Sequence, residues 1–289
     1  MTLKFASWNV EGRLSQYATK GRGTPDKIID EIERVDADVI VLPEAYDKHK
    51  GVSQHIDARI WSLGYKHVHD VEYRDGGPFR YDGAVEAPYL RMMSKIAFQT
   101  IQTIRLGDIR NAIDATVIDP DSGKLIRMIG VHFDDRNEGL RLRQVDDVVS
   151  LTNDSAIPIA LLGDMNAMYG ESKIARLLSH GATRTLAHAI PHEKLSDVMV
   201  RATDMATGTT IKRLMASGML RDADDKHRFT TTARMRGMEW MPSARLLDID
   251  HILVSPELET SDFRIGKYDA GSDHRPISVQ VTMRHDLQK

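Results

Sequence analysis

Six short segments of the chain place acids, amides or histidines at or beside the end of an apolar run. They are Trp8-Asn9-Val10-Glu11-Gly12, Pro43-Glu44, Gly130-Val131-His132-Phe133, Gly163-Asp164-Met165-Asn166, Asp248-Ile249-Asp250-His251 and Ser272-Asp273-His274-Arg275-Pro276. Because these groups are spread from Asn9 to His274, one site built from all of them requires the two ends of the chain to meet. This favours a single domain over residues 1–289.

Carboxylates, amides and imidazoles in this combination suit hydrolysis assisted by a hard cation. Mg²⁺ takes carboxylate and water oxygens and needs few protein ligands, so one or two carboxylates at strand ends suffice. Such a metal polarises a phosphoryl oxygen and neutralises charge on the leaving group, while other side chains align water and hold the phosphate. The chain has no cysteine, which excludes disulfides, thiolate-bound zinc and a cysteine nucleophile.

Each segment alone also has an ordinary structural explanation. Asp164 can be a turn acid, Ser272-Asp273-His274 a helix cap or surface turn, and Glu44 a solvated strand terminus. His132 can be a strand histidine with satisfied hydrogen bonds, and Asn9 can cap a turn. The functional interpretation depends on the whole set, in this order along the chain.

The elements that would position these side chains include several short apolar strands. Leu3 to Val10 alternates as a strand, and Asp38 to Glu44 is an apolar run ended by Pro43, which is typical of a buried strand that emerges at a sheet edge. Further strands are expected at Asn111 to Ile118, Leu125 to Phe133, Pro158 to Leu162, Ile249 to Val254 and Pro276 to Val281. The turn residues Asp121-Ser122-Gly123 predict a hairpin.

Helical periodicity lies between some of these strands. Pro25 to Val35 carries isoleucines on one stripe, with Thr24 as the predicted N-cap and proline at the first helical position. Leu140 to Leu151 and Ser172 to Ser179 are the other predicted helices. This mixture indicates sheets layered with helices.

The bulk composition is that of an ordinary globular protein. The 289 residues are 41% hydrophobic and 28% charged, with a mean hydropathy of -0.36. No run approaches the ~18 apolar residues of a membrane span, and Met1 to Trp8 lack the regions of a cleavable signal, so we expect a cytoplasmic protein. The formal net charge of -3 argues against a globally basic nucleic-acid wrapper but leaves room for a local basic face.

Taken in order, the segments resemble the endonuclease/exonuclease/phosphatase superfamily. The resemblance runs from Ser7 to Val281, and Gly163-Asp164-Met165-Asn166 and Ser272-Asp273-His274-Arg275-Pro276 are its most specific parts. The superfamily includes deoxyribonuclease I, apurinic endonucleases, bacterial sphingomyelinases, inositol polyphosphate phosphatases, deadenylases and tyrosyl-DNA phosphodiesterases. The resemblance implies a four-layered α/β sandwich, with two mixed β-sheets packed face to face, helices on the outside and a metal at one end.

The resemblance also implies metal-binding roles. Glu44 matches the principal metal ligand, and Asp273 matches a further acid close to the metal. Glu11 stands where some members place a second carboxylate. Asn9 matches the amide that supports both the metal and the phosphate.

The remaining matched residues would act on water and phosphate. Asp164 matches the acid that orients or deprotonates the attacking water, and Asn166 matches the amide that contacts the phosphate beside it. His274 matches the imidazole that binds the scissile phosphate or acts as base, with Asp250 paired to it. His132 matches a histidine that stabilises the transition state or assists the leaving group.

Physical chemistry narrows two of these roles. A carboxylate beside His274 favours the imidazolium, which is a better phosphate clamp and a poorer base, so we assign base duty to Asp164. Arg110 or Asn111, at the start of a predicted strand, could donate to the phosphate. An exposed strand-end salt bridge is the alternative for Arg110.

Two further segments contain cationic side chains. Trp240 lies in the cation-containing stretch Arg234 to Met241, which is either a substrate loop that stacks a base or lipid on the indole, or a packed surface loop. Arg141-Leu142-Arg143 is expected to be a solvated helical face.

The resemblance implies a hydrolase that cleaves a phosphoester with Mg²⁺ or Mn²⁺, and the Trp240 segment favours a phosphodiester in nucleic acid, cut in endonuclease or exonuclease fashion. A lipid or inositol phosphate is the alternative substrate. A non-catalytic binding protein of the same fold is a third alternative, disfavoured because every expected acidic and imidazole position is filled. We expect a monomer by default.

Overall fold

The structure is a computed structural model that describes residues 2–15, 24–46, 51–72, 89–107, 110–153, 155–189, 193–216, 218–232 and 245–284. Its helices are α1 (Pro25–Val35), α2 (Gln54–Ser62), α3 (Glu138–Asn153), α4 (Lys173–Ser179), α5 (Gly181–Ala189), α6 (Glu193–Met205) and α7 (Thr209–Ala216). The Trp240 segment and its arginines, Arg234 and Arg236, lie outside the described residues.

Most of the strands belong to two six-stranded sheets. The first has the order β13-β14-β1-β2-β4-β3, and its strands are β13 (Leu258–Ile265), β14 (Ile277–Met283), β1 (Leu3–Ser7), β2 (Val39–Leu42), β4 (Tyr89–Ser94) and β3 (His67–Glu72). The second has the order β5-β6-β7-β8-β12-β9, and its strands are β5 (Phe98–Leu106), β6 (Arg110–Ile118), β7 (Leu125–His132), β8 (Ile159–Asp164), β12 (Asp250–Val254) and β9 (Arg221–Asp222). A short ribbon pairs β10 (Thr231–Thr232) with β11 (Arg245–Leu247).

Both large sheets are mixed. In the first sheet β1 pairs parallel with β2 and antiparallel with β14, and in the second β7 pairs parallel with β8 while β12 pairs antiparallel with β8. The sheets pack face to face, because one buried cluster joins Phe5, Val41 and Met92 of the first sheet to Ile113 and Leu162 of the second.

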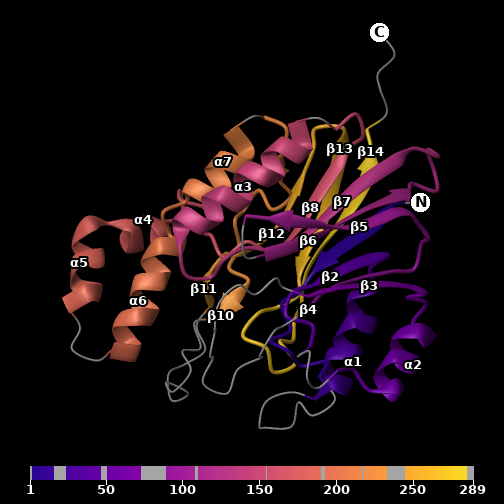
Figure 1. The fold of residues 1–289 in the computed structure, drawn as a ribbon, viewed down its shortest axis with the longest axis horizontal. Helices are drawn as coiled ribbons and strands as arrows, with labels where there is room; N and C mark the ends of the chain where they lie inside the picture. The colour runs from indigo at the N-terminus through magenta and orange to yellow at the C-terminus, as the bar shows by residue number, and fades with distance from the viewer. Residues whose placement is uncertain are drawn as a thin grey trace.

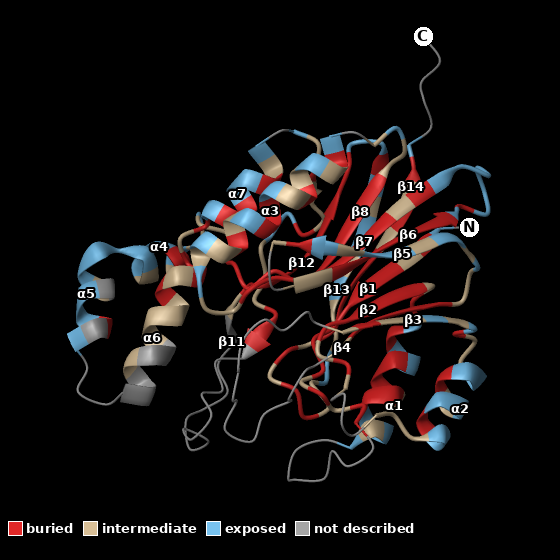
Figure 2. Cartoon of the chain, in the orientation of Figure 1, coloured by how far each residue is buried: buried red, intermediate tan, exposed pale blue. Residues whose placement is uncertain are grey.

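Helices cover the two outer faces (Figure 1). α1 and α2 bury their apolar stripes against β2 and β4, in a cluster that includes Ile28, Ile32, Ile56, Ile40 and Met93. α3 and α7 pack against β7 and β8 in a cluster that includes Val148, Ile211, Leu214, Ile129 and Leu161. Figure 2 shows the buried residues concentrated in the sheets and on the inner faces of these helices. The predicted four-layered α/β sandwich is therefore confirmed.

The first helix begins where the sequence predicts. The Thr24 side chain accepts a hydrogen bond from the backbone N–H of Lys27, and Pro25 opens the helix with its fixed φ. The helix is capped at its C-terminus by Asp36, which takes a left-handed conformation with φ 48° and donates its backbone N–H to the Ile32 carbonyl. The hairpin across Asp121-Ser122-Gly123 also forms, because β6 and β7 pair antiparallel on either side of it.

The prediction for the face of α3 was wrong at Arg141. Its side chain is fully buried: Nη1 donates to the Asp134 carbonyl at 2.8 Å, and Nε donates to Glu138 Oε2 at 2.7 Å. Glu138 also accepts hydrogen bonds from Thr207 and Thr210. Arg141 therefore ties the loop after β7 to the start of α7, which is a structural role that helical periodicity does not reveal. Arg143 is exposed, as predicted.

Among the residues that the structure describes, no helix combines the length and the apolar character needed to cross a bilayer.

Candidate active site

Strand register brings three of the predicted side chains together in the second sheet. His132 is paired with Asp164 at the ends of the parallel strands β7 and β8. Asp164 is in turn paired with Asp250 across the antiparallel strands β8 and β12. Neighbouring strands lie ~4.8 Å apart, so an imidazole and two carboxylates occupy adjacent positions in one row.

Gly163 allows this close approach of the strands. A Cβ atom at this position would lie 1.9 Å from the Val131 carbonyl oxygen, and the φ angle of Gly163 is +156°. No side chain can be accommodated against a backbone atom at that distance. Gly163 is thus required for β7 to pack against β8. Asp164, the next residue, belongs to the site.

The first sheet contributes Asn9 and Glu44. The chain beyond β1 runs along the chain beyond β2, with hydrogen bonds from Trp8 N to Val41 O and from Val10 N to Pro43 O. Asn9 Nδ2 donates to Asp164 Oδ2 at 2.9 Å and lies 3.3 Å from Glu44 Oε1. One buried amide therefore links the polar ends of the two sheets.

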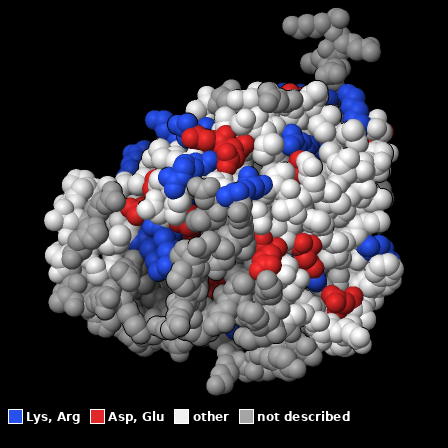
Figure 3. Space-filling model, in the orientation of Figure 1, with Lys and Arg blue, Asp and Glu red and all other residues white. Residues whose placement is uncertain are grey.

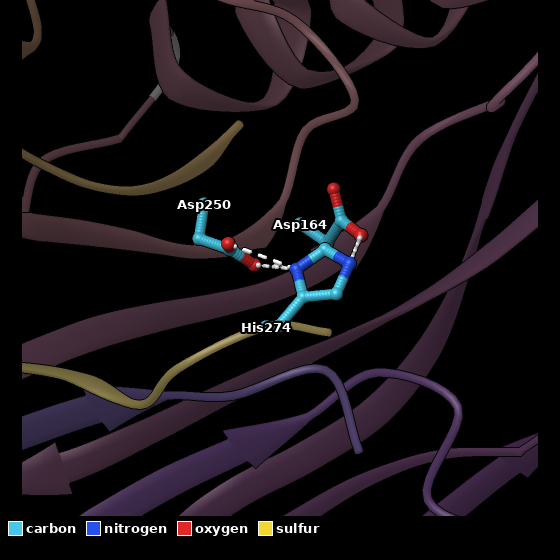
Figure 4. A group of neighbouring side chains, drawn as sticks. All are labelled: Asp164, Asp250 and His274. Atoms are coloured by element: carbon cyan, nitrogen blue, oxygen red, sulfur yellow. Dashed lines mark hydrogen bonds and ion pairs between the residues drawn. The ribbon is translucent and has the colours of Figure 1, made fainter. Parts of the chain in front are cut away.

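His274 is held by its Nδ1 atom. That atom lies 3.0 and 2.9 Å from the two oxygens of Asp250, and both groups are buried (Figure 4). The hydroxyls of Thr230 and Thr231 also donate to Asp250 Oδ2, at 2.7 and 3.0 Å. Burial alone would lower the pKa of His274, but the charges of Asp250, Asp273 and Asp164 together outweigh it, with Asp250 contributing most, and the pKa is raised well above the usual value. This contact is the predicted pairing of Asp250 with His274, and it favours the imidazolium form of the His274 ring.

Two imidazoles flank the Asp164 carboxylate. His274 Nε2 lies 3.7 Å and His132 Nε2 lies 3.6 Å from Asp164 Oδ2. Burial, reinforced by the charge of Arg110, lowers the pKa of His132 well below its usual value. The two histidines thus have opposite protonation states near neutral pH. Burial raises the pKa of Asp164, against the opposing charge of His274.

Several carboxylates crowd the same region. Burial raises the pKa of Glu44 to about 7, and the negative charge of Glu11 adds to this rise. Burial also raises the pKa of Asp273, with Glu11 and Glu44 contributing. A divalent cation among these oxygens would relieve both the repulsion and the cost of burial, so the donor set fits a hard, oxygen-preferring metal.

A second grouping could also hold a cation. Ligand atoms of Asp164, Asp250 and His274 lie within 4.8 Å of one another. However, the Asp250 carboxylate already accepts from His274 and from two threonine hydroxyls. A metal there would have to replace these hydrogen bonds, so the hydrogen-bonded pair explains this contact better.

Some predicted residues are placed differently from expectation. Asn166 is buried with φ 48°, and its side-chain nitrogen donates to the Phe133 carbonyl at 3.0 Å. That nitrogen therefore supports the loop after β7. Arg110 Nη2 lies 3.3 Å from Asp135 Oδ1, with the guanidinium largely buried. Arg201 of α6 approaches the same carboxylate at 3.5 Å.

No role in the site was predicted for several residues that support it. Thr230 and Thr231 bind Asp250, and no periodic pattern connects them to it. Trp8 Nε1 donates to the His274 carbonyl at 3.1 Å. The Ser272 hydroxyl donates to the Asn9 carbonyl at 2.8 Å and accepts from His274 N. The Trp8 and Ser272 side chains thus join the two ends of the chain by donating to the backbone carbonyls of His274 and Asn9.

Comparisons with known proteins identify a family and a shared fold. The sequence profile described as "Endonuclease/Exonuclease/phosphatase family" matches residues 6–274. No curated protein matches the sequence.

Solved structures share the fold at low identity. An endonuclease/exonuclease/phosphatase from Beutenbergia cavernae superposes with a TM-score of 0.67 at 18% identity, over 98% of this chain and 72% of that one. The human Nocturnin catalytic domain with bound sulfate superposes with a TM-score of 0.62 at 17% sequence identity, over 98% of this chain and 95% of that one. The 3′ phosphatase NExo from Neisseria, bound to a product DNA hairpin, superposes with a TM-score of 0.57 at 19% sequence identity, over 98% of this chain and 100% of that one. Since the family profile spans nearly the whole chain and the fold agrees with it, this chain belongs to the endonuclease/exonuclease/phosphatase family of phosphoesterases.

Proposed function

We propose that the chain hydrolyses a phosphodiester bond in nucleic acid, with Mg²⁺ or Mn²⁺ as cofactor. The observation that supports this most directly is the placement of Asp164 between one imidazolium and one neutral imidazole. A proton acceptor with a cation and a neutral hydrogen-bonding group each within 4 Å of it provides the groups that water attack on phosphorus needs.

Glu44 and Asp273 would hold the metal, with Asn9 and Glu11 beside them. When bound, the cation supplies polarisation of a phosphoryl oxygen and neutralises charge on the leaving group. The Asn9 amide already lies between Glu44 and Asp164. It therefore orients the carboxylates whether or not it contacts the metal directly.

Asp164 acts as the base. It is buried, its pKa is raised toward neutrality, and it accepts hydrogen bonds from Asn9 Nδ2 and Asn166 N that hold it in position. It takes a proton from the attacking water while the water oxygen bonds to phosphorus and the bond to the leaving oxygen breaks. The protonated His274 holds a phosphate oxygen through Nε2–H, because Nδ1–H is committed to Asp250.

His132 and Arg110 act on the other side of the phosphate. Neutral His132 offers a hydrogen bond to the developing charge or to the leaving oxygen. Arg110 and Arg201 both approach Asp135, and the charge of Arg110 acts on His132. This supports Arg110 as a phosphate donor that Asp135 holds in place.

Two comparisons bear on the substrate. NExo is described with a product DNA hairpin, which supports nucleic acid. A mannosyl-6-phosphatase from Bacteroides thetaiotaomicron has a TM-score of 0.53, which supports a phosphomonoester as the second candidate. Both substrates require the same attack on phosphorus, so the choice depends on groups around the catalytic centre.

The test is hydrolysis of bis-p-nitrophenyl phosphate with Mg²⁺ or Mn²⁺, before and after excess EDTA. We expect activity that EDTA abolishes and added metal restores. Activity that persists unchanged in EDTA would overturn the metal-dependent proposal. A panel of single-stranded and duplex DNA, RNA, abasic DNA, sphingomyelin and inositol phosphates then separates the substrate classes.

A further inference from the structure

A pocket of about 680 Å³ lies outside the catalytic residues described above. Its lining includes the basic side chains Lys173, Lys226 and Arg228, with His227 and Phe229 beside them. No described lining residue is acidic. The volume falls within the ~300–1,000 Å³ typical of small-ligand sites.

The basic loop of the pocket is held in one conformation by Asp224. This carboxylate is 5% exposed and accepts hydrogen bonds from Lys226 N and Arg228 N. It also pairs with the Arg228 guanidinium, which lies over the Phe263 ring at 4.8 Å. The charge of Arg228 is thus balanced within the loop, and its position is fixed.

Lys173 and Lys226 provide the uncompensated charge. Both side chains are exposed, and neither forms an ion pair with any residue in the described part of the chain. Lys173 opens α4, whereas Lys226 comes from the loop before β10, so two separate elements place ammonium groups around one cavity. Asp225 is exposed on the same loop but does not line the pocket.

Planar and apolar side chains form the rest of the lining. The His227 ring stacks on Tyr169 with centroids 3.7 Å apart and an interplanar angle of 10°. Phe229, Ile174 and Ile265 add apolar surface. Stacked rings beside ammonium groups suit a ligand that has both a planar part and a phosphate.

Two segments that line or support the pocket run close along the chain to the catalytic centre. Phe229 is two residues before Thr231, whose hydroxyl lies 3.2 Å from His274 Nδ1, and two residues span at most ~7 Å of chain. Tyr169, which supports the His227 ring, comes three residues after Asn166. A polymer whose scissile phosphate lies at His274 therefore has its neighbouring unit within reach of the pocket.

Figure 3 shows that Lys and Arg are interspersed with Asp and Glu on the face over α3 and α7. The described part of that face is not continuously basic. The phosphates of a nucleic-acid strand would therefore be held by a few local basic side chains. We propose that the pocket binds the nucleotide next to the scissile phosphate of a single nucleic-acid strand, with its phosphate between Lys173 and Lys226 and its base against His227 and Phe229. This inference rests on the proposed phosphodiesterase function.

The test compares Lys173→Ala/Lys226→Ala with the matched control Lys27→Ala/Lys212→Ala, which removes two exposed lysines from α1 and α7. Binding of a fluorescein-labelled single-stranded oligonucleotide is measured by anisotropy, in an Asp164→Asn background with Mg²⁺. We expect Kd to rise about tenfold at moderate salt in the pocket variant only. The slope of log K against log salt should fall by about 0.7, since the two lysines hold one phosphate and each single-strand phosphate contact contributes about 0.7.

Hydrolysis of bis-p-nitrophenyl phosphate by the same double variants, with Asp164 intact, separates the two proposals. The pocket variant should keep the wild-type rate, because this diester has only one phosphate. Unchanged oligonucleotide affinity and salt slope, in a chain that hydrolyses the small diester, would overturn the pocket and leave the catalytic proposal standing. Oligonucleotide binding that depends on Lys173 and Lys226, in a chain that hydrolyses neither the small diester nor the oligonucleotide, would support the pocket and reject the catalytic proposal.

Discussion

His274 Nδ1 lies 2.9 Å from the buried carboxylate of Asp250, so the imidazole is held by the nitrogen that faces away from Asp164. This contact sets both the orientation and the charge of the ring. It leaves Nε2 3.7 Å from Asp164 Oδ2, on the side where a phosphate would bind. Several measurable consequences follow from this arrangement and from the groups around it.

Replacing Asp250 with Asn removes the charge that raises the pKa of His274. We expect the alkaline limb of the pH–rate profile to move to lower pH, because the imidazolium then loses its proton more easily. The rate at the optimum should fall by about 10²-fold or more. Asp262→Asn, at an exposed ion pair with Arg264, is the control. An alkaline limb that stays in place would show that His274 does not act as the cation.

Replacing Asp164 with Asn should lower kcat by about 10²–10⁴-fold, the usual contribution of a positioned acid or base. The fold should survive because the amide is nearly isosteric and its one oxygen can still accept one of the two hydrogen bonds from Asn9 and Asn166. Circular dichroism and thermal unfolding check the fold. Asp146→Asn, at an exposed pair with Arg213, is the matched control. A loss of less than about threefold would remove Asp164 from the base role.

Replacing Glu44 with Gln should raise the concentration of Mg²⁺ or Mn²⁺ needed for half-maximal rate. An amide is a weaker ligand for a hard cation than a carboxylate. Titration of activity with metal after EDTA treatment measures this concentration. Glu259→Gln, at an exposed position paired with Arg284, should leave it unchanged. An unaltered metal requirement in Glu44→Gln would dismiss Glu44 as a principal ligand.

His251 predicts a pH-dependent contribution to stability. Burial disfavours its charge, but the hydrogen bond to Asp222 and that carboxylate's charge raise the pKa of His251 to about 9. The folded state therefore holds a proton that the unfolded state, with a histidine pKa near ~6.5, releases. The contribution of His251 to the free energy of unfolding should be fully present below pH ~6.5. This contribution, on the order of 3 kcal/mol, should be lost as pH rises through about 9.

Urea unfolding at several pH values measures this contribution. His251→Gln should lose the part of the alkaline dependence that His251 contributes, because glutamine does not titrate, and should keep the part that comes from the raised pKa of His274. Equal slopes for the two proteins between neutral pH and pH 9 would contradict the assignment.

Replacing Gly163 with Ala should cost about 3 kcal/mol or more, because the new Cβ would lie 1.9 Å from a backbone oxygen of the neighbouring strand. Gly181→Ala is the control, since a Cβ there meets nothing within 4 Å. Thermal unfolding of the two variants compares them. Similar melting temperatures would mean that β7 and β8 approach less closely than described.

The sequence predicted some elements well because their patterns are local. Thr24-Pro25 and the isoleucine stripe define α1 without reference to the rest of the chain. The apolar runs of β2, β8 and β12 are long enough to be recognised by composition alone. In contrast, β3 and β5 have partly exposed, mixed patterns, and α5 and α6 lie in a segment for which no helix was predicted. These elements form through tertiary contacts that outweigh weak local preferences.

The sequence by itself determined which chemical groups are present and that each lies at or beside one end of an apolar strand, since residue type and apolar pattern are local properties. The family follows from the order of those groups. Only the tertiary structure decided that His132, Asp164 and Asp250 share one row, because strand register depends on pairing between distant segments. It also decided that His132 is neutral and His274 positively charged, because burial and partner distance set a pKa, and neither exists before the chain folds.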